Sequence, residues 1–219
     1  MVELSFRVIG AALPFDHGYL LYGALSGLIP ELHGLERFSL GLVRGQPLGD
    51  GSMRLGAEAR LQLRLGTEHV PMVLPLAGKT LRVGGDLVQI GTPEIRALAP
   101  NPVLQSRFVT IKKFDRDPES FGEAVRRQMD ALDVRGGRVQ VGARRAVRIS
   151  GVRIVGFGVT IFDLADEDSL RVLESGIGGR RRMGCGVFEG LGKDAARAAR
   201  ENRPGRAVEV GGAMPATGT

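Results

Sequence analysis

The chain has 219 residues, of which 43% are hydrophobic and 25% are charged, the composition of a folded globular protein. Its 30 Lys and Arg against 24 Asp and Glu give a net charge of +6, which favours a polyanionic partner and leaves a basic metabolic enzyme as the alternative. A single cysteine, Cys185, excludes an intramolecular disulfide framework and a multi-cysteine metal cluster. The sequence has no secretory signal and no run of about 20 apolar residues, so we expect a cytoplasmic protein without a membrane partner.

Apolar periodicity predicts the order β-α-β-β-α-β for the first half of the chain. A helix is predicted from Asp16, a suitable N-cap, to Pro30, and a short helix over residues 69–76. The predicted strands are residues 3–9, 38–43 and 53–65, followed by a strand pair over 80–90 that turns at Gly84-Gly85.

The same order of elements is predicted again in the second half. The predicted strands are residues 103–111, 139–149, 152–164 and 183–188, and the predicted helices are 118–132 and 167–176. We therefore expect an α+β protein made of two ferredoxin-like halves, each an antiparallel sheet with helices on one face. The expected division is 1–100, 101–190 and a flexible tail over 191–219, in which 195–200 could form a helix.

The most specific local sequence lies between residues 176 and 186, where five glycines surround three consecutive arginines. Glycines allow close backbone approach and expose N–H donors, and guanidinium groups bind phosphate oxygens in pairs. The sequence therefore predicts a phosphate-binding loop, and the alternative is a solvated, flexible loop. The candidate residues are Gly178, Gly179, Arg180, Arg181 and Arg182.

This loop ends in GCGVF, and the chain resembles the Cas six family of the repeat-associated mysterious protein (RAMP) superfamily. The supporting segments are DHGYLLYGAL at residues 16–25, PELHG at 30–34, SRFVTIKKF at 106–114 and GVRIVGFGV at 151–159. Together they resemble the myxococcal-type branch over about residues 3–189. The resemblance implies tandem ferredoxin-like folds and a CRISPR repeat RNA as partner, cut beside its hairpin where it has one.

The resemblance also implies an endoribonuclease that processes precursor CRISPR RNA into guide RNAs. In the implied reaction a ribose 2′-hydroxyl attacks the adjacent phosphate and yields a 2′,3′-cyclic phosphate and a 5′-hydroxyl, with neither metal nor cofactor. The alternatives are a non-catalytic RAMP subunit that binds guide RNA within a type I effector complex with other Cas proteins, and an enzyme acting on a small phosphorylated metabolite.

Such a reaction requires a base, a cation and an acid, and imidazole is the side chain that ordinarily titrates near neutral pH. The resemblance implies His33 as the catalytic histidine and Arg37 as the cation. His17 is also a candidate, or else a capping or packing residue; a helix between His17 and residue 29 rises ~18 Å, so it should not act jointly with His33. The third role stays open, with Tyr19 or Tyr22 as proton donors, stacking platforms or packing residues.

Positive charge is concentrated in residues 101–160, which hold 12 Lys or Arg against six Asp or Glu. Alternating positions on strands can present such side chains on one face, where RNA phosphates could bind, although a solvated face is the alternative. The candidate RNA-binding residues there are Arg107, Lys112, Lys113, Arg144, Arg145 and Arg148.

Overall fold

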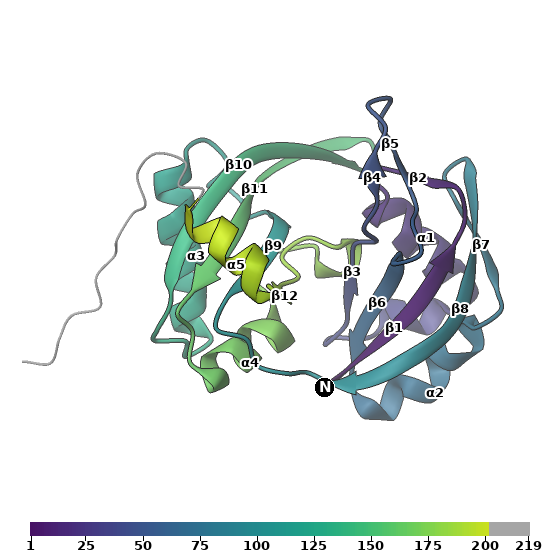
Figure 1. Cartoon of the computed structure of the whole chain (residues 1–219), viewed down its shortest axis with the longest axis horizontal. Helices are drawn as coiled ribbons and strands as arrows, with labels where there is room; N and C mark the ends of the chain where they lie inside the picture. Colours follow the sequence, from purple (N-terminus) through teal and green to yellow (C-terminus); the bar gives the residue numbers. More distant parts are fainter. Residues whose placement is uncertain (202–219) are drawn as a thin grey trace, which may run out of the picture.

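A computed structural model describes residues 1–201, which form two α/β units side by side (Figure 1). The first unit is a five-stranded antiparallel sheet in the order β3-β6-β1-β8-β7. Its strands are β1 (Val2–Ile9), β3 (Ser39–Gly41), β6 (Arg60–Leu65), β7 (Thr80–Val83) and β8 (Asp86–Ala97). Its helices and 3₁₀ turns are α1 (Gly18–Leu28), η1 (Pro30–His33), η2 (Thr67–His69), α2 (Val70–Val73) and η3 (Leu74–Leu76).

The second unit is a four-stranded antiparallel sheet in the order β10-β11-β9-β12. Its strands are β9 (Leu104–Val109), β10 (Arg138–Ile149), β11 (Val152–Phe162) and β12 (Glu189–Gly190). Its helical elements are α3 (Pro118–Ala131), α4 (Asp166–Ser175), η4 (Arg181–Met183) and α5 (Lys193–Glu201). A third, small sheet of β2 (Ala12–Pro14), β5 (Ser52–Arg54) and β4 (Gln46–Pro47) lies beside the first unit.

Strand alternation explains how each unit forms its core. On β1 the inward side chains Leu4, Phe6 and Val8 are buried, and Leu21 and Leu25 of α1 belong to the same core cluster. Burying each of these leucines contributes about 2 kcal/mol. The second core is built in the same way, with α3 and α4 contributing to the cluster that covers β9 and β11.

The two units share one strand order, which identifies the repeated fold. In the first unit β1, β3, β6 and β8 take the places that β9, β10, β11 and β12 take in the second. In both units the first strand therefore lies between the third and fourth, and the second strand lies at the edge. The expected tandem ferredoxin-like architecture is confirmed, with β7 and the small sheet as additions to the first unit.

Several predicted elements differ from the observed ones. The single strand predicted over 53–65 is two strands, β5 and β6, separated by a turn around Gly56. The strand predicted over 183–188 is instead the end of η4 and an irregular segment, with β12 beginning at residue 189. Residues 193–201 form α5, which packs against Phe162, whereas residues 202–219 of the expected flexible tail lie outside the described part of the chain. The division at residues 100 and 190 stays a prediction.

Two β-bulges meet opposite Gly158 on β11. Between paired residues 141 and 144, β10 carries one more residue than β11, and between 106 and 109, β9 does the same. Each bulge alters the side-chain alternation of its strand locally. The β10–β11 hairpin is thereby bent, and its tip extends toward the small sheet of the first unit (Figure 1).

A buried guanidinium joins the two units. The side chain of Arg64 on β6 is only 5% exposed and pairs with Glu3 on β1, with 2.8 Å between Nε and Oε2. Its Nη1 donates to the carbonyl oxygens of Leu173 on α4, at 3.1 Å, and Phe188 before β12, at 2.6 Å. One side chain of the first sheet thus satisfies two buried carbonyls of the second unit.

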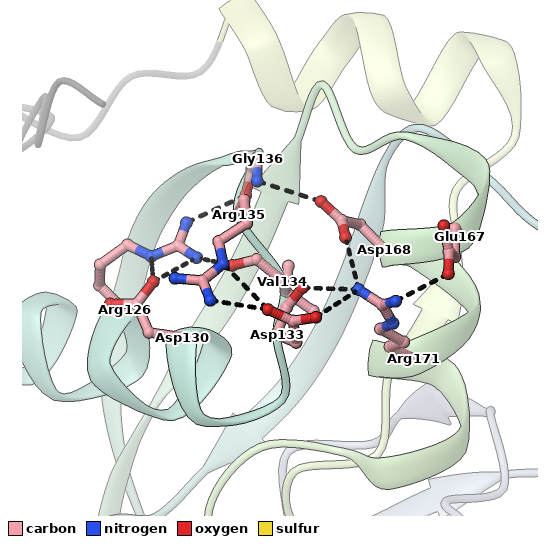
Figure 2. Close-up of polar contacts among 9 residues, drawn as sticks. All are labelled: Arg126, Asp130, Asp133, Val134, Arg135, Gly136, Glu167, Asp168 and Arg171. Atoms are coloured by element: carbon pink, nitrogen blue, oxygen red, sulfur yellow. Dashed lines mark hydrogen bonds and ion pairs between the residues drawn. The ribbon is translucent and has the colours of Figure 1, made fainter. Parts of the chain in front are cut away.

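A network of charges anchors the start of α4 to the end of α3 (Figure 2). Arg171 on α4 donates to the Asp133 carbonyl at 2.6 Å and to Glu167 at 2.7 Å. Asp168 accepts from the Gly136 amide at 3.0 Å, so both ends of the loop between α3 and β10 are tied down. Because α4 leads directly into the glycine-rich segment, this network fixes where that segment begins.

No helix within residues 1–201 is long and apolar enough to cross a membrane.

We expect Arg64→Ala to lower the free energy of unfolding by about 3 kcal/mol, because Glu3 and two buried carbonyls lose their partner. Urea denaturation measures this, with Arg96→Ala as the matched control, since Arg96 is an exposed arginine paired with Glu94 and should change stability by less than about 1 kcal/mol. Equal, small changes in the free energy of unfolding for the two substitutions would show that Arg64 does not stabilise the contact between the units.

Candidate active site and nucleic-acid interface

His33 lies at the end of η1, exposed to solvent, where the chain leaves α1. Its Nδ1 atom is 3.1 Å from the hydroxyl of Tyr22, a buried residue of α1. The two rings meet edge to face, with centroids 5.5 Å apart and planes at 84°. Since Nδ1 is engaged, Nε2 is the ring nitrogen that remains for a substrate.

The glycine-rich segment lies against the backbone that carries His33. Arg182 donates from Nη1 to the His33 carbonyl at 2.7 Å and from Nη2 to the Leu35 carbonyl. One planar guanidinium therefore connects η4 of the second unit to the loop before β3 of the first. The structure thus brings His33 and the predicted arginine cluster together, although Arg182 itself is committed to protein carbonyls.

Arg37 lies on the same loop and is paired across the unit boundary. Its Nη2 atom is 3.0 Å from Oε2 of Glu174 on α4, while 66% of the Arg37 side chain remains exposed. An exposed pair of this kind contributes little to stability and exchanges partners readily. Arg37 is therefore accessible to an anion beside His33.

His17 occupies a different environment, at the opposite end of α1. It is fully buried, its Nδ1 lies 3.0 Å from the Pro14 carbonyl, and its Nε2 accepts from the Val43 amide at 3.0 Å. Burial lowers the pKa of His17 to about 4. Both ring nitrogens are used within the protein, so we do not retain His17 as a catalytic candidate. The expected N-cap, Asp16, is also not observed, because His17 holds that position without a side-chain capping bond.

Tyr19 lies one helical turn before Tyr22, on α1 but beside a separate cavity. Its ring packs partly buried against the cluster of Phe108, Ile149 and Cys185. The structure therefore separates the two tyrosines, and Tyr22 rather than Tyr19 contacts His33. Burial raises the pKa of the Cys185 thiol to about 12, which fits a packing residue.

The glycine-rich segment is a packed structure, which differs from the flexible, solvated loop considered as an alternative and from a loop with exposed N–H donors. The Gly178 amide donates to Gln128 Oε1 at 2.6 Å, and the Gly179 amide donates to the Thr110 carbonyl at 3.1 Å. The amides of residues 183–186 are also bonded within the protein. The N–H groups of Gly178 and Gly179 therefore already have acceptors within the protein.

Glycine is needed in two places because backbones approach closely there. A Cβ on Gly18, in the first turn of α1, would lie 2.2 Å from the Met183 carbonyl oxygen. Gly184 has a φ of +80°, and a Cβ there would lie 2.3 Å from the Leu42 side chain. The glycine-rich segment therefore lies directly against α1 and against the residue that follows β3.

The three arginines of the segment differ in what they contact. Arg182 holds the His33 loop, and Arg181 donates to the Ser175 carbonyl. Arg180 is exposed in a left-handed conformation with φ of 65°, and its guanidinium has no hydrogen bond or ion pair with the described residues. Of these three, Arg180 has the guanidinium most available for RNA.

The other RNA-binding candidates occupy two places. Arg107, Arg145 and Arg148 line one cavity between α1 and the β10–β11 hairpin. Lys112 and Lys113 are exposed in the turn after β9. Arg144 is exposed too and donates to the Asp115 carbonyl at 3.0 Å, which orients it toward that turn.

Sequence reasoning did not single out two contributors to this arrangement. The contact between Tyr22 and His33 spans 11 residues and a change from α-helix to 3₁₀ turn, so no simple spacing predicts it. The hydrogen bonds of Arg64 join residues more than 100 positions apart. In the sequence, an arginine at an alternating position of a strand cannot be distinguished from an ordinary exposed charge.

The depressed pKa of His17 predicts an acid-sensitive fold. Between the ordinary histidine value near 6.5 and about 4, the unfolded chain binds a proton at His17 that the folded chain does not. Stability is therefore lost as the pH falls through this range, by about 3 kcal/mol at pH 4. The measurement is urea denaturation at pH 7 and at pH 4. Because Gln cannot titrate, the free energy of unfolding of His17→Gln should fall between these pH values by about 3 kcal/mol less than that of the unsubstituted chain. Identical pH dependence of the two would show that His17 does not titrate in this way.

We expect Arg182→Ala to loosen the segment that carries His33. Its two carbonyl partners lose their donor, so the η1 amides of Leu32 and Gly34 should exchange with deuterium faster, while β1 amides should not change. Hydrogen exchange followed by mass spectrometry measures this, with the neighbouring Arg180→Asn as control. Unchanged protection of residues 30–36 would show that the guanidinium is dispensable.

Comparison with known proteins identifies the family. The family model described as Cas6 Crispr matches residues 2–192. The chain is 41% identical over 209 residues to the CRISPR-associated endonuclease Cas6 of Myxococcus xanthus (strain DK1622), covering 94% of this chain and 87% of that one.

The fold of the chain also superposes on solved structures. One is a CRISPR associated protein Cas6, with TM-score 0.61, 16% identity and coverage of 87% of this chain and 98% of that one. Another is described as an RAMP protein binding different RNA substrates, with TM-score 0.62, 13% identity and coverage of 88% and 100%. With its repeated strand order and its exposed His33 beside an arginine-bearing segment, the chain belongs to the Cas6 (Cas six) family.

Proposed function

We propose that this protein is an endoribonuclease that cuts CRISPR repeat RNA within precursor transcripts, by attack of a ribose 2′-hydroxyl and without metal. Membership of the Cas6 family and the printed activity of the Myxococcus xanthus relative support an endonuclease. The observation that carries the mechanism is the exposed His33 imidazole, oriented by Tyr22 and located where arginines of the second unit meet the first.

Proton transfer is assigned to Nε2 of His33. The Tyr22 hydroxyl can accept from a protonated Nδ1, which leaves Nε2 of the neutral ring as a base. In this form Nε2 accepts the proton of the attacking 2′-hydroxyl, and the ring becomes an imidazolium whose Nδ1–H still donates to Tyr22. The imidazolium can then transfer its Nε2 proton to the departing 5′-oxygen as the bond between phosphorus and that oxygen breaks, which restores the neutral ring.

Stabilisation of the phosphorane charge is assigned to Arg37. In the free protein Glu174 neutralises this guanidinium, and the phosphate would replace the carboxylate as its partner. Two oxygens of a phosphate match the fork of a guanidinium, so the exchange places positive charge where negative charge develops. Glu174 thus keeps Arg37 directed toward the boundary between the units before RNA binds.

Binding of the RNA is assigned to the basic residues of the second unit. Arg180 is available within the glycine-rich segment, and Arg145 and Arg148 line the cavity next to the start of α1. Lys112 and Lys113 extend the positive charge past the end of β9. Contacts of this kind with phosphates would provide affinity and register for the repeat, whereas sequence preference requires contacts with bases.

The decisive test is cleavage of the CRISPR repeat RNA of the source genome in EDTA. We expect His33→Ala to reduce the single-turnover cleavage rate at least ~100-fold with RNA affinity retained, because only proton transfer is lost. Tyr22→Phe should slow cleavage less, since the ring stays packed and only the hydroxyl is removed. His69→Ala is the matched control, a partly exposed histidine paired with Glu68 on η2, and should cleave normally.

Three results would contradict this proposal. Equal rates for His33→Ala and His69→Ala would remove His33 from the chemistry. Cleavage that requires a divalent cation would exclude the metal-independent reaction. Tight binding of the repeat without any cleavage would favour the alternative, a RAMP subunit that binds guide RNA.

A second prediction concerns the arginine that the structure leaves available. Arg180→Asn removes one positive charge and keeps a residue type that tolerates the left-handed backbone. We expect weaker binding of all RNA sequences alike and a decrease of about one unit in the slope of log affinity against log salt concentration. Filter binding at several salt concentrations measures it, with Arg135→Ala at the far end of the second unit as control. An unchanged slope would exclude Arg180 from the phosphate contacts.

A further inference from the structure

A cavity of about 540 Å³ lies between the start of α1 and the β10–β11 hairpin, at the opposite end of α1 from His33. Its volume is in the range of sites that enclose small organic ligands. Its lining is mainly apolar and aromatic, with contributions from both units. These lining residues are Phe15, Tyr19, Leu42, Phe108, Ile149 and Met183.

Two opposite charges line this cavity without pairing with each other. The Arg107 guanidinium lies over the Phe15 ring, 5.4 Å from its centroid, and makes no ion pair or hydrogen bond within residues 1–201. Burial lowers the pKa of Arg107, and Arg145 and Arg44 nearby lower it further. Asp16 is an exposed residue, and its limited desolvation raises the pKa of its carboxyl against the opposing effect of Arg107. A donor fork and an acceptor therefore line one cavity, and neither side chain has a hydrogen bond or ion pair with the described residues.

The bulge in β9 accounts for the presence of Arg107 in the cavity. In a regular strand, adjacent side chains point to opposite faces, yet Arg107 and Phe108 are adjacent and both line this space. The extra residue of β9 opposite Gly158 lies at this point, between the pairs formed by Ser106 and Val109. Bulges that redirect a side chain in this way are concentrated beside functional sites.

A second cavity, of about 920 Å³ and more open, adjoins the first and shares Phe15, Asp16, Tyr19 and residues 146–148 with it. It continues along the small sheet and the hairpin tip, where Arg148 and Arg153 add positive charge. A ligand seated in the inner cavity would thus have a basic groove for phosphates extending from it. This continuity fits a nucleotide within a chain better than a free metabolite.

We propose that the inner cavity binds an unpaired guanine base of the RNA, an inference that rests on the proposed RNA-binding function and assigns it a base-specific subsite. The N1–H and N2–H donors of guanine match the two oxygens of Asp16. The O6 and N7 acceptors match the fork of Arg107, and the apolar lining with Phe15 and Tyr19 suits the base plane. Adenine and the pyrimidines lack this combination of two donors on one edge and two acceptors on the other.

The test uses mononucleotides, whose binding does not depend on cleavage. Titration calorimetry or NMR titration should show that GMP binds about tenfold more tightly than IMP, which lacks only the 2-amino group, the factor expected for one hydrogen bond to a charged group. Asp16→Asn should abolish this difference, and Arg107→Lys should weaken GMP and IMP alike. His33→Ala, which tests the proposed catalysis separately, should bind GMP as the unsubstituted chain does, and Arg135→Ala is the control for loss of a distant charge.

A second arm uses the repeat RNA with inosine replacing each unpaired guanosine in turn. One position should weaken binding to the unsubstituted protein about tenfold and have no effect on Asp16→Asn. Equal affinities for GMP, IMP, AMP and ribose 5-phosphate, or an AMP preference that Asp16→Asn leaves unchanged, would overturn the guanine subsite. If His33→Ala loses cleavage while the protein binds GMP, IMP, AMP and ribose 5-phosphate equally well, the catalytic proposal stands and only the guanine subsite is refuted.

Discussion

A buried guanidinium, that of Arg64, restricts how the two units can move relative to each other. Arg64 is held by Glu3 within the first sheet and satisfies two carbonyls of the second unit, so the units cannot shift without exposing or abandoning buried polar groups. Because its acceptors lie at the end of α4 and just before β12, they bracket the glycine-rich segment. The segment is therefore fixed against the first unit at both of its ends, and Arg182 can then contact the His33 loop.

Helix α1 serves a different purpose at each end because its two ends meet different surroundings. At its start, His17 is buried and bonded through both ring nitrogens, and Gly18 lets the glycine-rich segment approach closely. From the second turn, Tyr22 reaches the exposed His33 on η1, which follows the end of the helix. The start of the helix is packed and lines a cavity, whereas His33 beyond its end faces solvent. The packed start thus supports the position of the Tyr22–His33 pair.

Local sequence patterns predicted most of the fold because strand alternation and helix signals are local. The failures have physical causes. Residues 53–65 alternate without interruption, yet the chain turns near Gly56, which no hydrophobic period reveals. The segment over 183–188 is apolar because its side chains pack into the two units, with Met183 and Cys185 beside Phe108 and Phe188 in the second core, not because it pairs with a strand. In the site, the arginine segment was identified from its own composition and His33 from the family resemblance. The burial of His17 and the hydrogen bonds of Arg181 and Arg182 depend on tertiary contacts that residue type does not encode.

The paired bulges opposite Gly158 have a consequence for how this protein could diversify. Each bulge accommodates one extra residue of its strand, so removing that residue would restore regular pairing opposite Gly158 while the flanking side chains keep their faces. A single-codon deletion in β9 would turn Arg107 or Phe108 out of the cavity without disturbing the core of the first unit. Related chains could thus acquire a different RNA preference through one insertion or deletion, with the rest of the scaffold inherited unchanged.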